Sequence, residues 1–230
     1  LTDRKKTVLK AIATQQKLTA TLQAAIITAA TLQDVEDLYL PYKQKKRTKA
    51  MIARENGLQP LADFVLTHLS EEIPTEAYIN DALADAAAVL AGLHEIIAEQ
   101  IGEKAIYRQW LRERMQRDGF LTVTVKRDGE EKDAQGVYAQ YYDYSESLKS
   151  LQMNTFRILA VNRGEKDGVL SVKIDFSEER MRHFIQIKER NGQGDSGEGY
   201  QVLLSAIDDA YKRFIQPAVA RELRQELTVL

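Results

Sequence analysis

A dense group of cations is the first feature of this chain that could support binding chemistry. Five cations lie within seven positions: Lys43, Lys45, Lys46, Arg47 and Lys49. Each lysine or arginine that neutralises a phosphate releases counterions, so a few such contacts suffice for weak, sequence-independent binding of RNA or DNA. We therefore predict a nucleic-acid-binding site here and name residues 43–49 the basic segment.

Two tyrosines flank the basic segment, and Tyr39 and Tyr42 could each stack on a nucleic-acid base. The competing interpretation is a solvated loop whose cations pair with the nearby acids Asp34, Glu36 and Asp37. The residues by themselves leave both interpretations open.

Three further motifs favour structural roles. Arg108, Arg112, Arg114 and Arg117 form a second basic run, with Glu103 and Glu113 interleaved, which is typical of a solvated helix face. The string from Gly192 to Gly197 matches a dinucleotide-binding pattern, but the required strand and acidic residue do not follow it, so we predict a mobile loop over 191–199.

Four tyrosines form a cluster in the sequence: Tyr138, Tyr141, Tyr142 and Tyr144. We interpret them as packed rings with surface hydroxyls, rather than as an RNA platform.

No group of residues has the spacing of a catalytic or metal site. The chain has no cysteine, which excludes thiolate nucleophiles and cysteine-ligated zinc. Its histidines, His68, His94 and His183, lie far apart in the sequence. Neighbouring acids such as Asp208 and Asp209 point about 100° apart on a helix, whereas two-metal nuclease chemistry needs converging carboxylates. We therefore predict no enzyme activity, no cofactor and no metal.

Composition restricts the class of protein. With 230 residues and 44% hydrophobic residues, the chain can bury one large core or two small ones. No run of apolar residues is long enough to cross a membrane, and no signal-peptide pattern opens the chain. The absence of cysteine fits the cytosol. Because the net charge is −2, nucleic-acid binding has to come from a local patch. The chain starts at Leu1 and its last residues still have helical spacing, so we expect a piece of a longer protein.

Hydrophobic spacing predicts a mainly α fold with a small antiparallel β-ribbon. Helices are expected over 3–16, 19–30, 31–40, 47–56, 60–69, 75–100, 103–117, 155–163, 200–214 and 217–229. Pro74 and Thr75 are expected to open the longest helix, which would span roughly 40 Å. Alternation predicts two strands, 120–126 and 169–176. Residues 137–151 favour a short helix, and 178–190 are ambiguous.

Four blocks of sequence resemble the bacterial Tex family of transcription accessory proteins. The first block is Asp37–Lys43 with Lys46–Ala50 and Gly57–Ala62, and the second is Tyr142–Tyr144 with Glu146. The third is Phe156–Lys166 with Gly168–Leu170, and the fourth is Asp209–Pro217 with Glu222, Arg224 and Leu227–Thr228; the blocks occur in family order. Gln44 and Met153–Thr155 depart from the family pattern, so the local turns there are expected to differ. The resemblance implies a largely helical scaffold. It also implies that longer relatives carry RNase H-like, helix-hairpin-helix and OB-fold domains after the segment seen here, with the OB-fold supplying most nucleic-acid binding.

The sequence therefore predicts two domains, an N-terminal helical region over 1–118 and an α+β region over 119–230. The predicted function is a non-catalytic, nucleic-acid-associated scaffold of a cytoplasmic bacterial Tex-like protein. RNA or DNA would be bound through the full-length protein, and weakly if at all through residues 1–230. The alternative is a helical module that docks on the transcription machinery.

Overall fold

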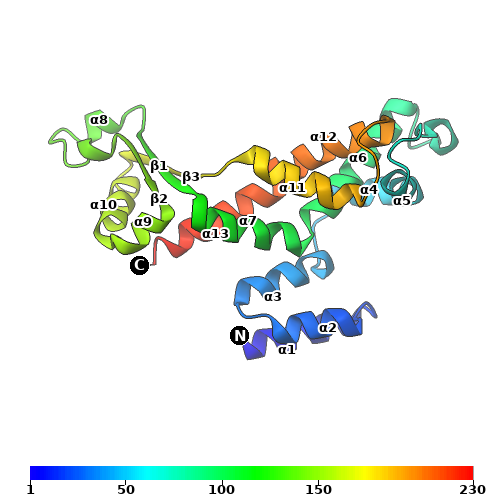
Figure 1. Ribbon diagram of the computed structural model, residues 1–230, viewed down its shortest axis with the longest axis horizontal. Helices are drawn as coiled ribbons and strands as arrows, with labels where there is room; N and C mark the ends of the chain where they lie inside the picture. Colours follow the sequence, from blue (N-terminus) through cyan, green and yellow to red (C-terminus); the bar gives the residue numbers. More distant parts are fainter. Residues whose placement is uncertain (230) are drawn as a thin grey trace. The chain divides into compact units, whose positions relative to one another are not determined.

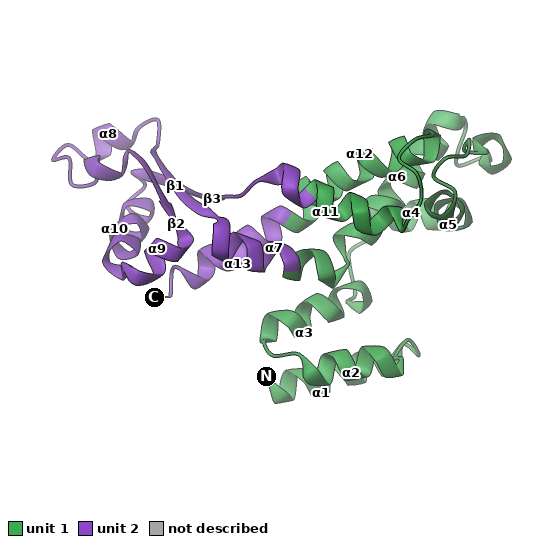
Figure 2. Cartoon of the chain, viewed as in Figure 1, with its two compact units in different colours: residues 1–109, 182–215 green, residues 110–181, 216–230 purple. Residues whose placement is uncertain are grey.

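The chain folds into helices and one small sheet, which form two compact units. The computed structural model describes residues 1–229. Unit 1 comprises Leu1–Gln109 and Arg182–Ile215, and unit 2 comprises Trp110–Met181 and Gln216–Leu230 (Figure 2). The predicted mainly α fold with a small antiparallel sheet is confirmed. Each unit is discontinuous in sequence, and the domain boundary expected near residue 118 stays a prediction.

Unit 1 begins with three short helices around a small apolar core. They are α1 (Thr2–Thr14), α2 (Ala20–Thr28) and α3 (Leu32–Tyr39) (Figure 1). The core side chains of these helices are fully buried; they are Val8, Ile12, Ile26 and Val35. α2 and α3 are each capped by a threonine, because the hydroxyls of Thr19 and Thr31 accept the N–H groups of Leu22 and Asp34.

The remainder of unit 1 is built around a central helix. Its elements are η1 (Leu40–Tyr42), α4 (Lys49–Glu55), α5 (Gln59–Thr67), η2 (Thr75–Tyr78), α6 (Ala86–Gly102), α12 (Glu198–Ala210) and the π-helical η4 (Tyr211–Ile215). The central α6 packs against α4, α5 and α12. A left-handed glycine, Gly57 with φ of +91°, follows the end of α4, and Pro60 lies in the first turn of α5.

The long helix expected from Pro74 is wrong in its first part. Residues 75–78 form only a 3₁₀ turn, and the side chain of Asn80 accepts the N–H groups of Ala82 and Leu83. Asp85 then caps α6 by accepting the N–H of Ala88. The local hydrogen bonds of Asn80 and Asp85 compete with helix formation although the apolar spacing runs through both residues. The helix has 17 residues and is therefore about 26 Å long.

Unit 2 contains the sheet, which has three strands rather than two. They are β1 (Phe120–Val125), β2 (Asp143–Ser147) and β3 (Leu170–Asp175), in the order β2-β1-β3, and both pairings are antiparallel. The short helix expected over 137–151 is therefore wrong for 143–147. The polar sequence of β2 has little strand propensity, and its pairing with β1 supplies the backbone partners that the sequence does not reveal.

Short helices complete unit 2. They are α8 (Gly129–Lys132), η3 (Ala139–Tyr141), α9 (Leu148–Met153), α10 (Thr155–Lys166) and α13 (Gln216–Glu226). Two further helices, α7 (Ala105–Asp118) and α11 (Glu178–Arg190), each contain residues of both units, and α11 occupies the segment that the sequence left ambiguous.

The break expected around Pro217 is a change of helix type. Proline cannot donate a backbone hydrogen bond, and its ring crowds the carbonyl one turn earlier. The turn before it, η4, is π-helical and connects α12 to α13 without a loop.

Candidate nucleic-acid interface

The basic segment connects η1 to α4 and consists largely of extended, exposed chain. Pro41 lies within η1, and Thr48 caps α4 by accepting the N–H of Met51 at 3.1 Å. Four of the five predicted cations, Lys43, Lys46, Arg47 and Lys49, are exposed, whereas Lys45 is half-buried. Lys45 therefore differs from the other four cations in its exposure to solvent.

Lys45 is directed toward α6 rather than solvent. Its ammonium forms an ion pair with Glu103, the residue that follows α6. Burial lowers the pKa of Lys45, as do the nearby guanidinium groups of Arg54 and Arg108, while the carboxylate of Glu99 acts in the opposite direction. This lysine therefore holds the basic segment against α6.

A carboxylate within α6 binds the end of the basic segment. Glu99 accepts a hydrogen bond from the hydroxyl of Thr48 and another from Arg54 Nη1, both at 2.8 Å. Burial would raise the pKa of Glu99, but the hydrogen bonds from Arg54 and Thr48, with the charge of Lys45, lower it. Glu99 and Glu103 lie one helical turn apart, so the last turn of α6 and the residue after it present two carboxylates to the basic segment.

The exposed cations differ in their neighbours. Arg47 forms an ion pair with Glu55 of α4 at 2.6 Å, and both side chains are more than half exposed. Lys43 lies near Glu36, whose pKa is lowered by its hydrogen bond with Arg4 and also by Lys43. Within residues 1–229, Lys46 and Lys49 form no ion pair. Of the pairing partners expected from the sequence, Glu36 lies near one cation, while Asp34 forms a capping box with Thr31.

The flanking tyrosines are engaged by the protein. Tyr39 and Tyr42 pack against the core of α1, α2 and α3, and the guanidinium of Arg4 lies 5.5 Å from the centre of the Tyr39 ring. The structure thus brings the predicted cations together on one segment but does not present these two rings with them.

The second basic run is not a solvated face throughout, which corrects the sequence interpretation. Arg108 donates to the carbonyl of Gly102 at the end of α6, and Arg112 binds Glu222 of α13 at 2.9 Å. Only 11% of the Arg112 side chain is exposed. These contacts join residues up to 110 positions apart, so helical spacing did not indicate them.

The tyrosine cluster stabilises the loops around the sheet. Tyr138 and Tyr142 donate to Asp167 and Asp133, at 2.5 and 2.9 Å, and the rings of Tyr141 and Tyr144 meet edge to face. The packed rings agree with the expectation, and these two hydroxyls are bound by carboxylates of the protein.

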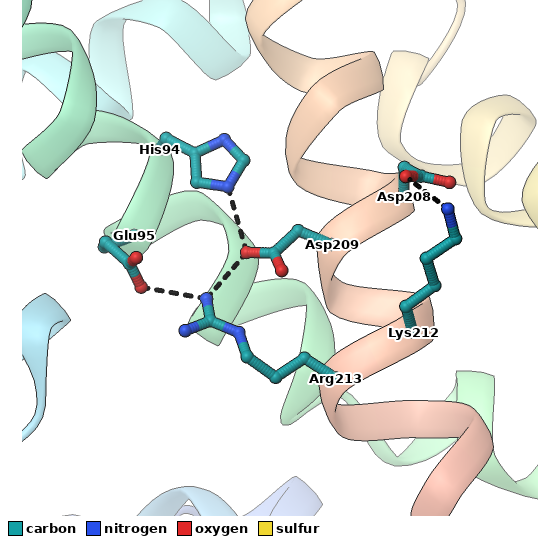
Figure 3. Close-up of polar contacts among 6 residues, drawn as sticks. All are labelled: His94, Glu95, Asp208, Asp209, Lys212 and Arg213. Carbon is teal, nitrogen blue, oxygen red and sulfur yellow. Dashed lines mark hydrogen bonds and ion pairs between the residues drawn. The ribbon is translucent and has the colours of Figure 1, made fainter.

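A polar cluster that the sequence did not reveal joins α6 to α12 and η4 (Figure 3). Asp209 accepts from His94 Nε2 at 2.9 Å and from Arg213 at 2.6 Å, and Arg213 also binds Glu95 at 2.8 Å. The guanidinium of Arg213 also lies 4.6 Å from the ring centre of Phe214. Of these contacts, the sequence indicates only the pair of Asp209 and Arg213, which lie four residues apart on a helix. All four groups have partners within unit 1, so the cluster acts as a structural tie.

The structure shows no arrangement suited to metal chemistry in the part of the chain that it describes. No group of three or more histidine, aspartate or glutamate residues within 1–229 could hold a metal ion. In the same range, no helix has the length and apolar character needed to cross a bilayer.

Comparison with known proteins identifies the family of this chain. The Tex central region-like family model matches residues 68–229, well over half of the chain. The chain belongs to the Tex family. This Tex chain is 37% identical to the protein YdcI of Bacillus subtilis over 238 residues, which cover 99% of the chain and 32% of YdcI. It is 39% identical to the transcriptional accessory protein Tex of Neisseria gonorrhoeae over 178 residues, covering 76% and 23% of the two chains.

A human relative has a name that refers to RNA. The S1 RNA-binding domain-containing protein 1 of Homo sapiens is 28% identical over 233 residues, covering 96% of this Tex chain and 23% of the human protein. This Tex chain thus spans less than a third of the length of these curated relatives. Relatives named for transcription and for RNA binding define a transcription-accessory, RNA-associated family.

Proposed function

We propose that this Tex-family chain is a nucleic-acid-associated scaffold region, without catalytic activity of its own, that presents the basic segment to phosphates. The proposal rests on one observation: some residues of the basic segment hold it to the protein, while others are exposed to solvent. Lys45 binds Glu103, which follows α6, and Thr48 binds Glu99 of α6, which leaves Lys43 and Lys46 exposed before α4 and Lys49 exposed in its first turn. An anchored segment with free ammonium groups loses little entropy when it binds a polyanion.

The names of the relatives support the same function. One is called a transcriptional accessory protein and another an S1 RNA-binding domain-containing protein. In a longer protein, the contribution of the basic segment would add to that of other nucleic-acid-binding domains through effective concentration. Contact through phosphates alone carries no base preference.

The first prediction concerns the three exposed lysines. Replacing Lys43, Lys46 and Lys49 with glutamine should weaken binding of the chain to a fluorescein-labelled oligouridylate, measured by anisotropy between about 50 and 200 mM salt. Each lost phosphate contact lowers the salt slope by about 0.7 for a single strand, so the triple variant should lose roughly 2.

A charge-matched control distinguishes local contact from net charge. Lys6, Lys10 and Lys17 are also exposed cations of unit 1, and their replacement with glutamine changes the net charge equally. We expect the control to bind like the parent chain. Equal weakening of both triple variants, or no binding by the parent at low salt, would contradict the proposal, and the second result is the one expected of a protein-docking module.

A further inference from the structure

One exposed face of unit 2 combines apolar and cationic side chains in a line. The residues lie at the end of α9 and along α10, and we name them the α10 stripe: Met153, Phe156, Leu159, Arg163 and Lys166. The exposed fractions of Met153, Phe156 and Leu159 are 77%, 64% and 53%. Contiguous large apolar residues in water are unfavourable, and such surfaces commonly mark binding sites.

Helical geometry places the stripe on one side of α10. The steps from Phe156 to Leu159, Arg163 and Lys166 are three, four and three residues, so these side chains follow one another along one face. The opposite face carries Ile158, Val161 and Gly164, which are buried. In Figure 1, α10 lies beside the sheet of unit 2, and it packs against β3. The core of unit 2 therefore uses one face of α10 and leaves the α10 stripe on the other.

The two ends of the stripe differ in character. Its first part is apolar, and its second part carries Arg163 and Lys166, which form no ion pair within residues 1–229. The acids beside them are already engaged, because Glu165 binds Arg224 at 2.5 Å and Asp167 accepts from Tyr138 at 2.5 Å. The cationic end is therefore complementary to carboxylates supplied from outside.

The aromatic ring in the stripe is poorly suited to a nucleic-acid base. The guanidinium of Arg157 lies over the Phe156 ring, 5.6 Å from its centre, and Arg157 also binds Glu146 at 2.8 Å. A base that stacks on this face of the ring would have to displace a cation held by an ion pair. Met153 and Leu159 offer no further ring, and flexible apolar side chains of this kind suit a protein partner instead.

From these contacts we propose that the α10 stripe docks an acidic amphipathic helix of a protein partner. The apolar residues of that helix cover Phe156 and Leu159, and carboxylates one to two turns away pair with Arg163 and Lys166. Recognition of apolar anchors at helical spacing with flanking charge is a common mode of helix binding. Because three apolar side chains make a small interface, the complex is transient rather than permanent. The proposal is independent of the basic segment, which belongs to unit 1.

Selection from a random peptide library displayed on phage, with the whole chain as bait, tests the proposal. Enriched peptides should be acidic, with apolar residues three and four positions apart. The same peptides should not be enriched when the Phe156→Ser/Leu159→Ser variant is the bait. For a synthetic copy of an enriched peptide, that variant should bind about tenfold or more weakly, as expected for the loss of a central anchor. Arg163→Gln/Lys166→Gln should weaken binding and reduce its salt dependence.

Two matched controls come from the same unit. Val137 has 60% of its surface exposed, and Lys126 and Arg127 are exposed cations, all outside the α10 stripe. Val137→Ser and Lys126→Gln/Arg127→Gln should leave peptide binding unchanged, and all substituted side chains are exposed, so circular dichroism should show the parent fold for every variant.

Three results would overturn the proposal. One is the absence of enriched peptides, or enrichment of peptides that are not acidic. Another is binding of oligouridylate that depends on Phe156, which would assign the surface to RNA. The last is dimerisation in sedimentation that Phe156→Ser abolishes, which would assign it to a second copy of the chain.

Discussion

Residues of one type take different roles in the basic segment because their neighbours differ. Lys45 and Lys46 are adjacent, yet Lys45 is half-buried beside Glu103 while Lys46 is exposed. An extended chain turns successive side chains to opposite sides. One lysine therefore meets α6, and the other meets solvent.

The anchoring role of Glu99 yields a prediction about stability. Glu99→Gln removes the charge that binds Thr48 and Arg54, and we expect it to lower the free energy of unfolding by about 1–3 kcal/mol. Urea denaturation followed by circular dichroism measures the change. The matched control is Glu55→Gln, whose pair with Arg47 is solvent-exposed and should contribute less than about 1 kcal/mol. Equal effects of the two substitutions would contradict the anchoring role.

The lowered pKa of Glu99 fixes the pH dependence of this effect. Since the folded pKa lies below the ordinary value of 4.5, the stabilisation is present above pH 4.5 and is lost as the pH falls through the folded pKa. The difference in unfolding free energy between the parent chain and Glu99→Gln should therefore be full at pH 7 and shrink below pH 4.5. A difference that stays constant down to pH 3 would show that the charge of Glu99 is not responsible.

At the scale of elements, the loop between α11 and α12 shows how a glycine-rich segment is held in place. Gln193 donates to the carbonyl of Leu66 and accepts the N–H of Leu69, so its side chain bridges the end of α5. Gly197 has φ of +105°, and a Cβ there would lie 2.5 Å from Cα of Ser70. The loop predicted to be mobile is thus fastened at two points.

A pair of substitutions within this loop tests the close approach. Gly197→Ala should destabilise the chain by about 2–4 kcal/mol, because alanine adds backbone strain and a steric clash with Ser70. Gly194→Ala should change stability by less than about 0.5 kcal/mol, since no atom lies within 4 Å of its Cβ position. Thermal or urea unfolding reports both values, and similar values for the two variants would argue against a tight contact at Gly197.

At the scale of the molecule, distant parts of the sequence complete each core. In unit 1, α12 follows α6 by nearly a hundred residues, yet the two helices pack together, and His94 of α6 binds Asp209 of α12, which also binds Arg213 of η4. Buried residues of α12 such as Leu203 and Ile207 therefore belong to the same core as those of α6.

The predicted boundary near residue 118 can be tested with a fragment. Residues 1–118 lack α12, so the apolar face of α6 would lose a partner, and we expect a lower unfolding midpoint in urea than for the whole chain. Far-ultraviolet circular dichroism would follow the transition. A fragment as stable as the whole chain would support an independent domain over 1–118 and remove the need for α12.

The sequence determined those features that depend on near neighbours. Caps at Thr19 and Thr31, the turn at Gly57, the strand alternation of β1 and β3 and the family blocks are all encoded within a few residues. The density of charge in the basic segment was equally visible. The helix start at Asp85 is also encoded locally, but the prediction followed the apolar periodicity and began the helix at Pro74 and Thr75.

Tertiary structure alone decided the features that depend on distant partners. Residues 143–147 form a strand because they pair with β1, and Lys45 meets Glu103 beyond the end of α6. His94 binds Asp209, which lies 115 positions away in the sequence. The physical reason is that strand pairing, burial and ion pairing are properties of neighbours in space. Residue types and spacing limit which partners are possible, but only the packed core determines which of them meet.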